Sequence, residues 1–392
     1  MRRGILEYAA GLMVVLAAVP ALAAVLYQVT DLGTLGGAES AAYAINDSGE
    51  VVGYSLNGQG LERAFRTAPS SPINPSTDDL GTLGGSYSRA YGINAVGQVV
   101  GYAGLPGSAD GHHAFRTAPN ARINSTTDDL GTLGGTWSVA LAINASGQVV
   151  GDSKLSGASI YSHAFRTGPN QPINPATDRL DPDGWTSGAY AINGSGQVAG
   201  WAWDGYERQF AIRSMSDGSF TYAVDLGGLR KYAVGWAHNV NASGQAVGIA
   251  YADNDTEHAF RTAPNARINA ETDDLGALGP PDLWSSNAWG INDRGEVVGS
   301  SWLAESSLPS HAFLYDGVKM VALEELIDPA LGWALNEARD INNLGQIVGW
   351  GTIGGQTHAF LLTPIPEPGG LLWGLAGILL LAHCRANVLC QH

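Results

Sequence analysis

The sequence predicts an all-β fold, specifically a seven-bladed β-propeller with four short strands in each blade. First, an Ile-Asn or Val-Asn dipeptide recurs seven times at a mean spacing of about 49 residues, a typical length for a propeller blade. Second, a polar, glycine-containing turn and then an apolar, mostly β-branched run follow every copy, which is a hairpin signal. Third, the chain has 53 glycines but is 45% hydrophobic, so many short strands and tight turns are expected rather than disorder.

Three sequence motifs recur along the chain with the same period. The asparagine recurs as Asn46, Asn94, Asn144, Asn193, Asn241, Asn292 and Asn342. A phenylalanine, usually within His-Ala-Phe, recurs as Phe65, Phe115, Phe165, Phe210, Phe260, Phe313 and Phe360. An Asp-Leu-Gly begins at Asp31, Asp79, Asp129, Asp225 and Asp274, while Leu180-Asp181 and Leu323-Glu324 stand there in the fourth and last units. We therefore expect seven copies of one structural unit.

Each unit is expected to form four strands. In the first unit, residues 40–46 form the first strand and residues 50–54 the second, with the turn 47–49 between them. Residues such as 113–117 form the third strand and 128–133 the fourth. The asparagine is expected to cap the turn with its side chain, in preference to binding a ligand.

Small residues are expected where strands approach closely. Alanines of the first strands, such as Ala42 and Ala44, fit positions near the axis, where the blades converge. One glycine recurs in the second strand of every unit and indicates close backbone approach: Gly53, Gly101, Gly151, Gly200, Gly248, Gly299 and Gly349. An N-terminal strand, residues 27–35, precedes the first unit, and the last unit lacks its fourth strand. We expect these two to pair and close the ring.

The two ends are expected to be targeting segments, so residues 24–363 form the propeller. Residues 1–23 have a charged start, an apolar run and the small-x-small signal Ala21-Leu22-Ala23, with cleavage before Ala24. The alternative for this end is a single membrane anchor. Residues 364–392 contain Pro366, Glu367 and Pro368, then an apolar stretch expected to be a membrane helix, and Arg385. The alternative there is a plain C-terminal anchor.

This C-terminal end closely resembles the PEP-CTERM sorting signal of Gram-negative bacteria, which a membrane protease-transpeptidase, an exosortase, reads at the Pro-Glu-Pro motif. That family usually ends in several arginines, whereas Arg385 alone follows the apolar run here. The repeated motifs Ala-Ile-Asn-x-x-Gly-Gln-Val-Val-Gly and His-Ala-Phe resemble HAF-type extracellular repeats, and the resemblance covers nearly all of residues 24–363. It implies an exported protein at the cell surface or in the extracellular matrix, anchored transiently in the membrane, and implies no reaction.

Composition excludes some classes of function. The net charge is −16 and lysine occurs three times, so the chain repels phosphate backbones and nucleic-acid binding is not expected. Cys384 and Cys390 lie at the extreme C-terminus, so the body has neither a disulfide nor a thiolate metal site.

The histidines and the acidic turns carry atoms that can bind a metal or serve structural roles. The repeated histidines are expected to hydrogen-bond within their units rather than hold a metal. The acidic pairs Asp78-Asp79, Asp128-Asp129 and Asp273-Asp274, and the loop Asp253–Asp255 with Glu257, carry oxygens that suit Ca²⁺, but none has the spacing of an EF-hand or RTX calcium loop. Structural turns are the favoured interpretation, with Ca²⁺ stabilisation as the alternative.

The candidate ligand site is the most divergent unit, the fourth. Trp201, Trp203, Asp204 and Glu207 combine aromatic rings and carboxylates, as sugar-binding surfaces do. Together with the variable loops between second and third strands, they predict a non-enzymatic protein that binds polysaccharide or another protein on one face. The alternative is a glycoside hydrolase or lyase that acts on extracellular polysaccharide, with paired carboxylates. No catalytic residue is assigned.

Overall fold

The computed structural model describes residues 26–108, 111–157, 161–182, 185–205, 209–214, 224–229, 234–252, 256–304, 306 and 309–366. Within these residues no helix is long and apolar enough to cross a membrane. The predicted cleavage residues Ala21, Ala23 and Ala24 lie outside the described residues, as do Glu367 and Pro368 of the sorting motif. The predicted N-terminal signal and C-terminal helix therefore stay predictions.

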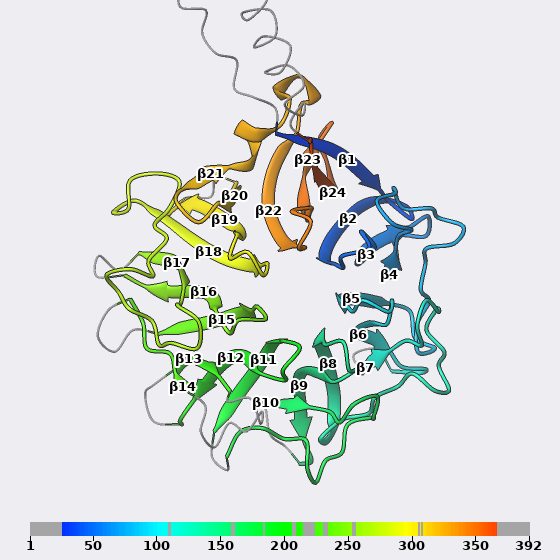
Figure 1. The fold of residues 1–392 in the computed structure, drawn as a ribbon. Coiled ribbons are helices and arrows are strands. Elements are labelled where there is room, and N and C mark those ends of the chain that lie inside the picture. The colour runs from blue at the N-terminus through cyan, green and yellow to red at the C-terminus, as the bar shows by residue number, and fades with distance from the viewer. Residues whose placement is uncertain are drawn as a thin grey trace, which may run out of the picture.

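The chain forms a propeller-like ring of antiparallel sheets (Figure 1). The first strands of the seven units lie innermost: β2 (Gly36–Ile45), β5 (Ser88–Ile93), β8 (Gly134–Ile143), β11 (Thr186–Ile192), β15 (Gly235–Val240), β18 (Trp284–Ile291) and β22 (Ala334–Ile341). The second strands are β3 (Val51–Asn57), β6 (Val99–Gly104), β9 (Val149–Leu155), β12 (Val198–Trp203), β16 (Ala246–Tyr251), β19 (Val297–Leu303) and β23 (Ile347–Ile353). The third strands are β4 (Glu62–Arg66), β7 (His112–Arg116), β10 (Ser162–Arg166), β13 (Gln209–Arg213), β17 (Glu257–Arg261), β20 (His311–Tyr315) and β24 (Gln356–Pro364).

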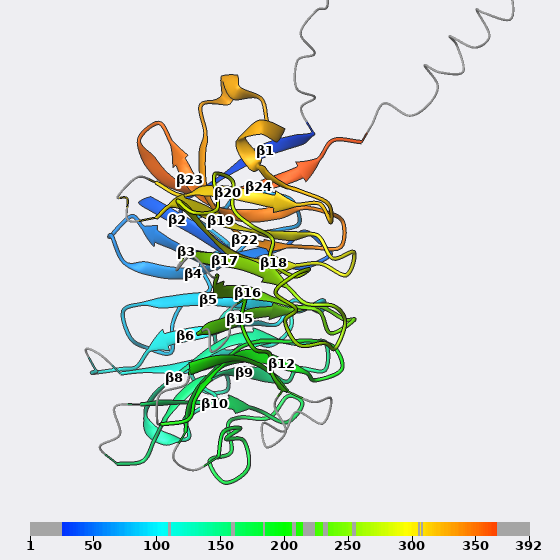
Figure 2. The same ribbon diagram turned by 90° about the vertical axis from the view of Figure 1, so that its left-hand side faces the viewer.

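The remaining elements are β1 (Tyr27–Gly33), β14 (Val224–Asp225), β21 (Met320–Ala322) and two 3₁₀ helices, η2 (Leu323–Leu326) and η3 (Pro329–Leu331). β1 pairs antiparallel with β24, from Tyr27 opposite Pro364 to Gly33 opposite Ala359. The expected pairing of the N-terminal strand with the last unit is therefore present, and Figure 2 shows β1 and β24 together at one edge of the ring.

The prediction of a seven-bladed propeller with four strands per blade is wrong. The strands form six sheets, none of them closed: three have three strands, two have four and one has seven. The seven-stranded sheet joins the first and last units, because β24 pairs with β1 and also meets β2 through Glu39 and Thr357.

The missing fourth strands have a local cause. In units one, two, three and five the expected segment makes a single bridge to the buried phenylalanine of the third strand, such as Asp79 with Phe65. The Asp79 carboxylate then accepts a hydrogen bond from the Gly81 N–H at 2.7 Å, and Gly81 has a φ of 82°. Before the bridge, the Asp78 N–H donates to the Asn74 carbonyl at 2.9 Å in a second turn. Turns on both sides therefore limit the pairing to one bridge, whereas β1 pairs over several residues before its own Asp31–Gly33 turn.

A ring of asparagines links the seven units. The Nδ2 of each repeat asparagine donates to the backbone carbonyl of the asparagine in the next unit, at 3.0–3.3 Å, and Asn342 returns to Asn46. The Oδ1 atom caps the turn, as predicted: in Asn144 it accepts the N–H groups of Ser146 and Gln148 at 3.1 and 3.0 Å. One side chain therefore closes its own hairpin and fixes the neighbouring unit.

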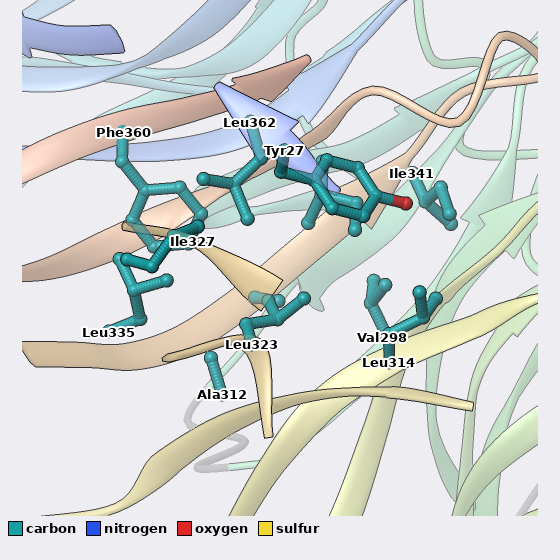
Figure 3. Close-up of a cluster of buried hydrophobic side chains, with 12 residues drawn as sticks. Tyr27, Val298, Ala312, Leu314, Leu323, Ile327, Leu335, Ile341, Phe360 and Leu362 are labelled. Carbon is teal, nitrogen blue, oxygen red and sulfur yellow. The ribbon is translucent and has the colours of Figure 1, made fainter. Parts of the chain in front are cut away.

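The core lies between neighbouring sheets. The repeat phenylalanines are fully buried in six units, and in the fourth Phe210 is half-buried while Ile212 is buried. Figure 3 shows one cluster where Tyr27 of β1 and Phe360 of β24 meet Leu323 of η2 and Leu335 of β22. This cluster ties the start of the described chain to the last two units, which supports the ring by burial of apolar area.

Candidate functional site

The innermost strands enclose a cavity of about 540 Å³, and all seven units contribute to it. It is lined by the residue three positions before each repeat asparagine: Tyr43, Tyr91, Leu141, Tyr190, His238, Trp289 and Arg339. The next residue is alanine or glycine in five units, and the exceptions are Asn239 and Asp340. Each unit therefore contributes one large side chain to the lining of the cavity, and the residue that follows it in the chain is mostly small.

A β-bulge positions these large side chains. In every unit the pairing of the first two strands skips the residue that lines the cavity, as at Tyr91, which lies between the paired residues Ala90 and Gly92. A bulge bends the strand and changes the direction of a side chain. The side chain of the skipped residue therefore does not follow the regular alternation between the two faces of the strand.

The recurring glycine makes the bulge possible. Gly101 faces Ala90, and a Cβ atom on Gly101 would lie 1.9 Å from the carbonyl oxygen of Arg89. The same approach, 1.9–2.0 Å, recurs at the other six glycines of the second strands. The predicted close backbone approach is confirmed, and its consequence is the geometry of the cavity.

The rings that line the cavity pack on one another. His238 stacks on Trp289 with ring centroids 4.3 Å apart, and Tyr190 lies 5.5 Å from His238. The Arg339 guanidinium lies 4.0 Å from the centre of the Trp289 ring and 5.3 Å from that of Tyr43. Tyr43 in turn contacts Tyr91 at 5.0 Å, and Leu141 completes the circle. We call these seven residues the aromatic girdle; all are half-buried, so they combine fixed positions with exposed faces.

The charges at the girdle are largely compensated. Burial, together with Arg339, lowers the pKa of His238 to about 4, so its imidazole is neutral at pH 7, and its Nδ1–H donates to the Ala288 carbonyl at 3.1 Å. Burial raises the pKa of Asp340 to about 6, although its carboxylate accepts the N–H groups of Ile45 and Ile341 at 3.0 and 2.9 Å. Arg339 forms an ion pair with Glu337. The cavity therefore offers aromatic faces with one compensated cation.

The residues proposed from the sequence lie elsewhere. Trp201 and Trp203 belong to β12, and Asp204 follows it and is buried; Glu207 lies outside the described residues. The Trp201 indole covers the backbone of Gly188, and the Trp203 ring lies 5.9 Å from that of Tyr161. These three described residues do not line the cavity. A ligand site at the fourth unit stays a prediction.

Sequence reasoning missed the girdle. Its signal was present: the position three before the asparagine is aromatic in five of seven units, but period-two alternation does not reveal a bulge.

The histidines and acidic turns have structural partners. Four histidines place Nδ1 at 2.8–3.0 Å from a carboxylate, in the pairs His113–Asp129, His163–Asp181, His258–Asp274 and His358–Asp31. Burial lowers the pKa of His258, but the Asp274 carboxylate outweighs it, and the net pKa is raised. Asp78 accepts the Asn74 N–H at 2.8 Å, and the same contact recurs at Asp128 and Asp273. Among the described residues no three His, Cys, Asp or Glu side chains are grouped so as to hold a metal ion; Asp253–Asp255 lie outside them.

Comparison with solved structures gives distant similarities. The chain is similar to the BP39L lectin from Burkholderia pseudomallei, with 13% identity, a TM-score of 0.43, and coverage of 84% of this chain and 99% of the lectin. It is similar to Trypanosoma rangeli sialidase in complex with DANA, with 12% identity and a TM-score of 0.40, over 86% of this chain but 57% of the sialidase. The six-bladed β-propeller lectin of Aleuria aurantia shows 11% identity and a TM-score of 0.34, over 85% of this chain and 97% of the lectin.

No curated protein matches the chain. The HAF-type repeats and the PEP-CTERM tail stay predictions from the sequence. A family profile matches residues 126–359, more than half of the chain, and on that ground the chain belongs to DUF3466, a family of proteins of unknown function.

Proposed function

We propose that this protein is a non-enzymatic carbohydrate-binding protein whose ligand enters the axial cavity and packs against the aromatic girdle. The observation that supports this most is the convergence of one bulged side chain from every unit on a cavity of about 540 Å³. Aromatic faces bind the C–H faces of sugar rings, and few polar groups suffice to fix the orientation of a small ligand.

The charges of the cavity favour a neutral or weakly charged ligand. The His238 imidazole is neutral at pH 7, and Arg339 is already paired with Glu337. Asp340 is the one carboxylate among the described residues that line the cavity. Its oxygens accept two backbone N–H groups, which is the role of a structural cap. Glycoside hydrolysis ordinarily uses two carboxyl groups, so this lining supports binding rather than hydrolysis.

The test is binding of the full chain to a panel of extracellular polysaccharides, with analysis of new reducing ends in every mixture. Trp289→Ala should weaken binding at least about tenfold, the order expected for a ligand-contacting aromatic anchor. Trp289→Phe, which keeps a ring, should retain most of the affinity. Trp203→Ala is the matched control, since it removes an indole outside the cavity and should leave binding unchanged.

Each outcome decides the proposal. Binding that Trp289→Ala weakens, without new reducing ends, supports it. Loss of binding with Trp203→Ala and not with Trp289→Ala would move the site to the predicted loops of the fourth unit. New reducing ends would contradict the non-enzymatic assignment, and a panel without any binding would reject a carbohydrate ligand in favour of a protein partner.

The proposed location rests on the two ends of the sequence. We propose export across the inner membrane, transient anchoring, and processing by an exosortase-type protease at Pro366, Glu367 and Pro368. Replacing the three residues by alanine should leave the chain in the membrane fraction, whereas the unchanged chain should reach the cell surface or the medium. Equal distribution of both chains would contradict processing at this motif.

A further inference from the structure

The segment between the third strand of the sixth unit and the first strand of the seventh departs from the repeat pattern, and a second cavity lies beside it. In four other units a histidine is paired with a carboxylate at 2.8–3.0 Å. Here η2 replaces the Asp-Leu-Gly segment, and His311 Nδ1 lies 3.4 Å from the Oε1 atom of Glu324. This looser pair borders a cavity of about 450 Å³.

Aromatic rings and carboxylates line this cavity, which we call the interunit cavity. Trp284 comes from β18, His311 from β20 and Trp333 from the residues before β22, and the Trp284 and His311 rings are 6.0 Å apart. Glu324 and Glu325 both line it, and none of its described lining residues is a lysine or arginine. An aromatic enclosure with unbalanced negative charge is the chemistry that binds cations.

Glu324 is fixed in place and incompletely paired. Its Oε1 accepts the Leu335 N–H at 3.1 Å, while Oε2 is buried and has no hydrogen-bond partner among the described residues. Leu323, the first residue of η2, and Ile327, which follows its last, point into the cluster of Figure 3, so the helix cannot shift without exposing apolar side chains. Burial raises the pKa of the Glu324 carboxyl, although its own N–H and His311 oppose the shift. The carboxylate therefore lacks a full positive partner.

We propose that the interunit cavity binds a primary ammonium group, as carried by an amino sugar or a lysine side chain. The ammonium donates hydrogen bonds to the Glu324 carboxylate, which lines the cavity and keeps the Leu335 N–H on its Oε1 atom. The indoles of Trp284 and Trp333 flank the cation. The net charge of −16 raises the local concentration of cations near the surface. This site is independent of the carbohydrate site proposed on the axis.

The test uses the full chain and three soluble probes: D-glucosamine, N-acetyl-D-glucosamine and Nα-acetyl-L-lysine methylamide. Titration followed by tryptophan fluorescence and by calorimetry should show saturation with the two amines that is weakened by Glu324→Gln. Any binding of the acetylated sugar should belong to the axial site, so it should be weakened by Trp289→Ala and kept by Glu324→Gln. Saturation by glucosamine alone identifies an amino sugar as the source of the ammonium, and saturation by the lysine derivative alone identifies a peptide. Both results support the site.

Variants separate this site from the axial one and from unfolding. Glu324→Gln keeps the shape and an acceptor for the Leu335 N–H but removes the charge, so amine binding should weaken about ten- to hundredfold. Trp333→Ala should weaken it as well. Asp129→Asn removes the ordinary partner of His113 in the second unit, and Trp289→Ala removes the axial indole; both should leave amine binding unchanged. Binding of N-acetyl-D-glucosamine that is weakened by Glu324→Gln, amine binding that is unchanged by Glu324→Gln, or no saturation by either amine would overturn the proposal.

Discussion

Gly101→Ala tests how the fold builds its axial cavity. A Cβ atom at this position would lie 1.9 Å from the Arg89 carbonyl oxygen and 2.9 Å from the Ala90 Cα. A carbon and an oxygen that are not bonded require roughly 3.2 Å, so strands β5 and β6 must separate by about 1 Å at the bulge. Both neighbours are backbone atoms, and no flexible side chain can give way.

The magnitude follows from the contacts that such a separation breaks. Overpacking in a buried site costs about 1–3 kcal/mol, and losing about two ladder hydrogen bonds adds about 1 kcal/mol each. We therefore expect Gly101→Ala to lower the free energy of unfolding by about 3–5 kcal/mol. Because Tyr91 is the bulged residue of this unit, its side chain should also lose its position in the girdle.

The assay is urea unfolding followed by tryptophan fluorescence, with Gly194→Ala as the matched control. Gly194 has no atom within 4 Å of an added Cβ, and alanine already stands at the equivalent turn positions 95, 145 and 242. The control should change stability by less than about 0.5 kcal/mol. If the free energy of unfolding of Gly101→Ala lies within about 1 kcal/mol of that of the unchanged chain, the bulge does not require the glycine and the reasoning fails.

Three further predictions concern the other repeated residues. Asn144→Ala should destabilise the fold by about 3–5 kcal/mol because it leaves several buried partners unpaired, whereas Asn144→Asp loses the donor to Asn193 but keeps the turn acceptor and should cost less; equal losses in urea unfolding would exclude a contribution from the turn acceptor. The pKa of His258 is raised in the fold, so its ion pair with Asp274 contributes its full stabilisation below a pH of about 6.5, and this stabilisation is lost as the pH rises through the folded pKa. The difference in free energy of unfolding between the unchanged chain and His258→Asn should therefore shrink between pH 6 and 9. A difference that stays constant over this range would contradict the ionic contribution. EDTA should leave the melting temperature unchanged because the oxygens of Asp128 and its counterparts accept backbone N–H groups, and a lowered melting temperature would favour the Ca²⁺ alternative.

The sequence was informative where one residue type has one physical use. The recurring asparagine indicated a capped turn, and the recurring glycine indicated close backbone approach; both features are present. The unmatched N-terminal strand indicated its pairing with the last unit, and β1 pairs with β24. These inferences depend on local geometry, which the types and spacing of residues largely determine.

The number of strands and sheets could not be obtained in this way. Asp-Leu-Gly predicts a strand, but the Asp78 N–H donates to the Asn74 carbonyl in a turn just before Asp79, and the pairing is limited to one bridge. Similarly, the contact of Glu39 with Thr357 joins the first and last units into one sheet through residues far apart in the chain. Such events depend on one hydrogen bond each, so a pattern averaged over seven repeats does not reveal them.

The girdle shows why a symmetric repeat can carry an asymmetric site. The buried phenylalanine is kept in six units because it fills the space between sheets, and Ile212 takes its place in the fourth. The bulged position instead carries tyrosine, leucine, histidine, tryptophan or arginine in the same backbone geometry. A side chain that the core does not require is free to differ between units, and its bulge directs it to the axis in each of them. Differences at this position therefore change the cavity without changing the ring, and the stacked series His238, Trp289 and Arg339 is the part of that circle where we propose that a ligand is oriented.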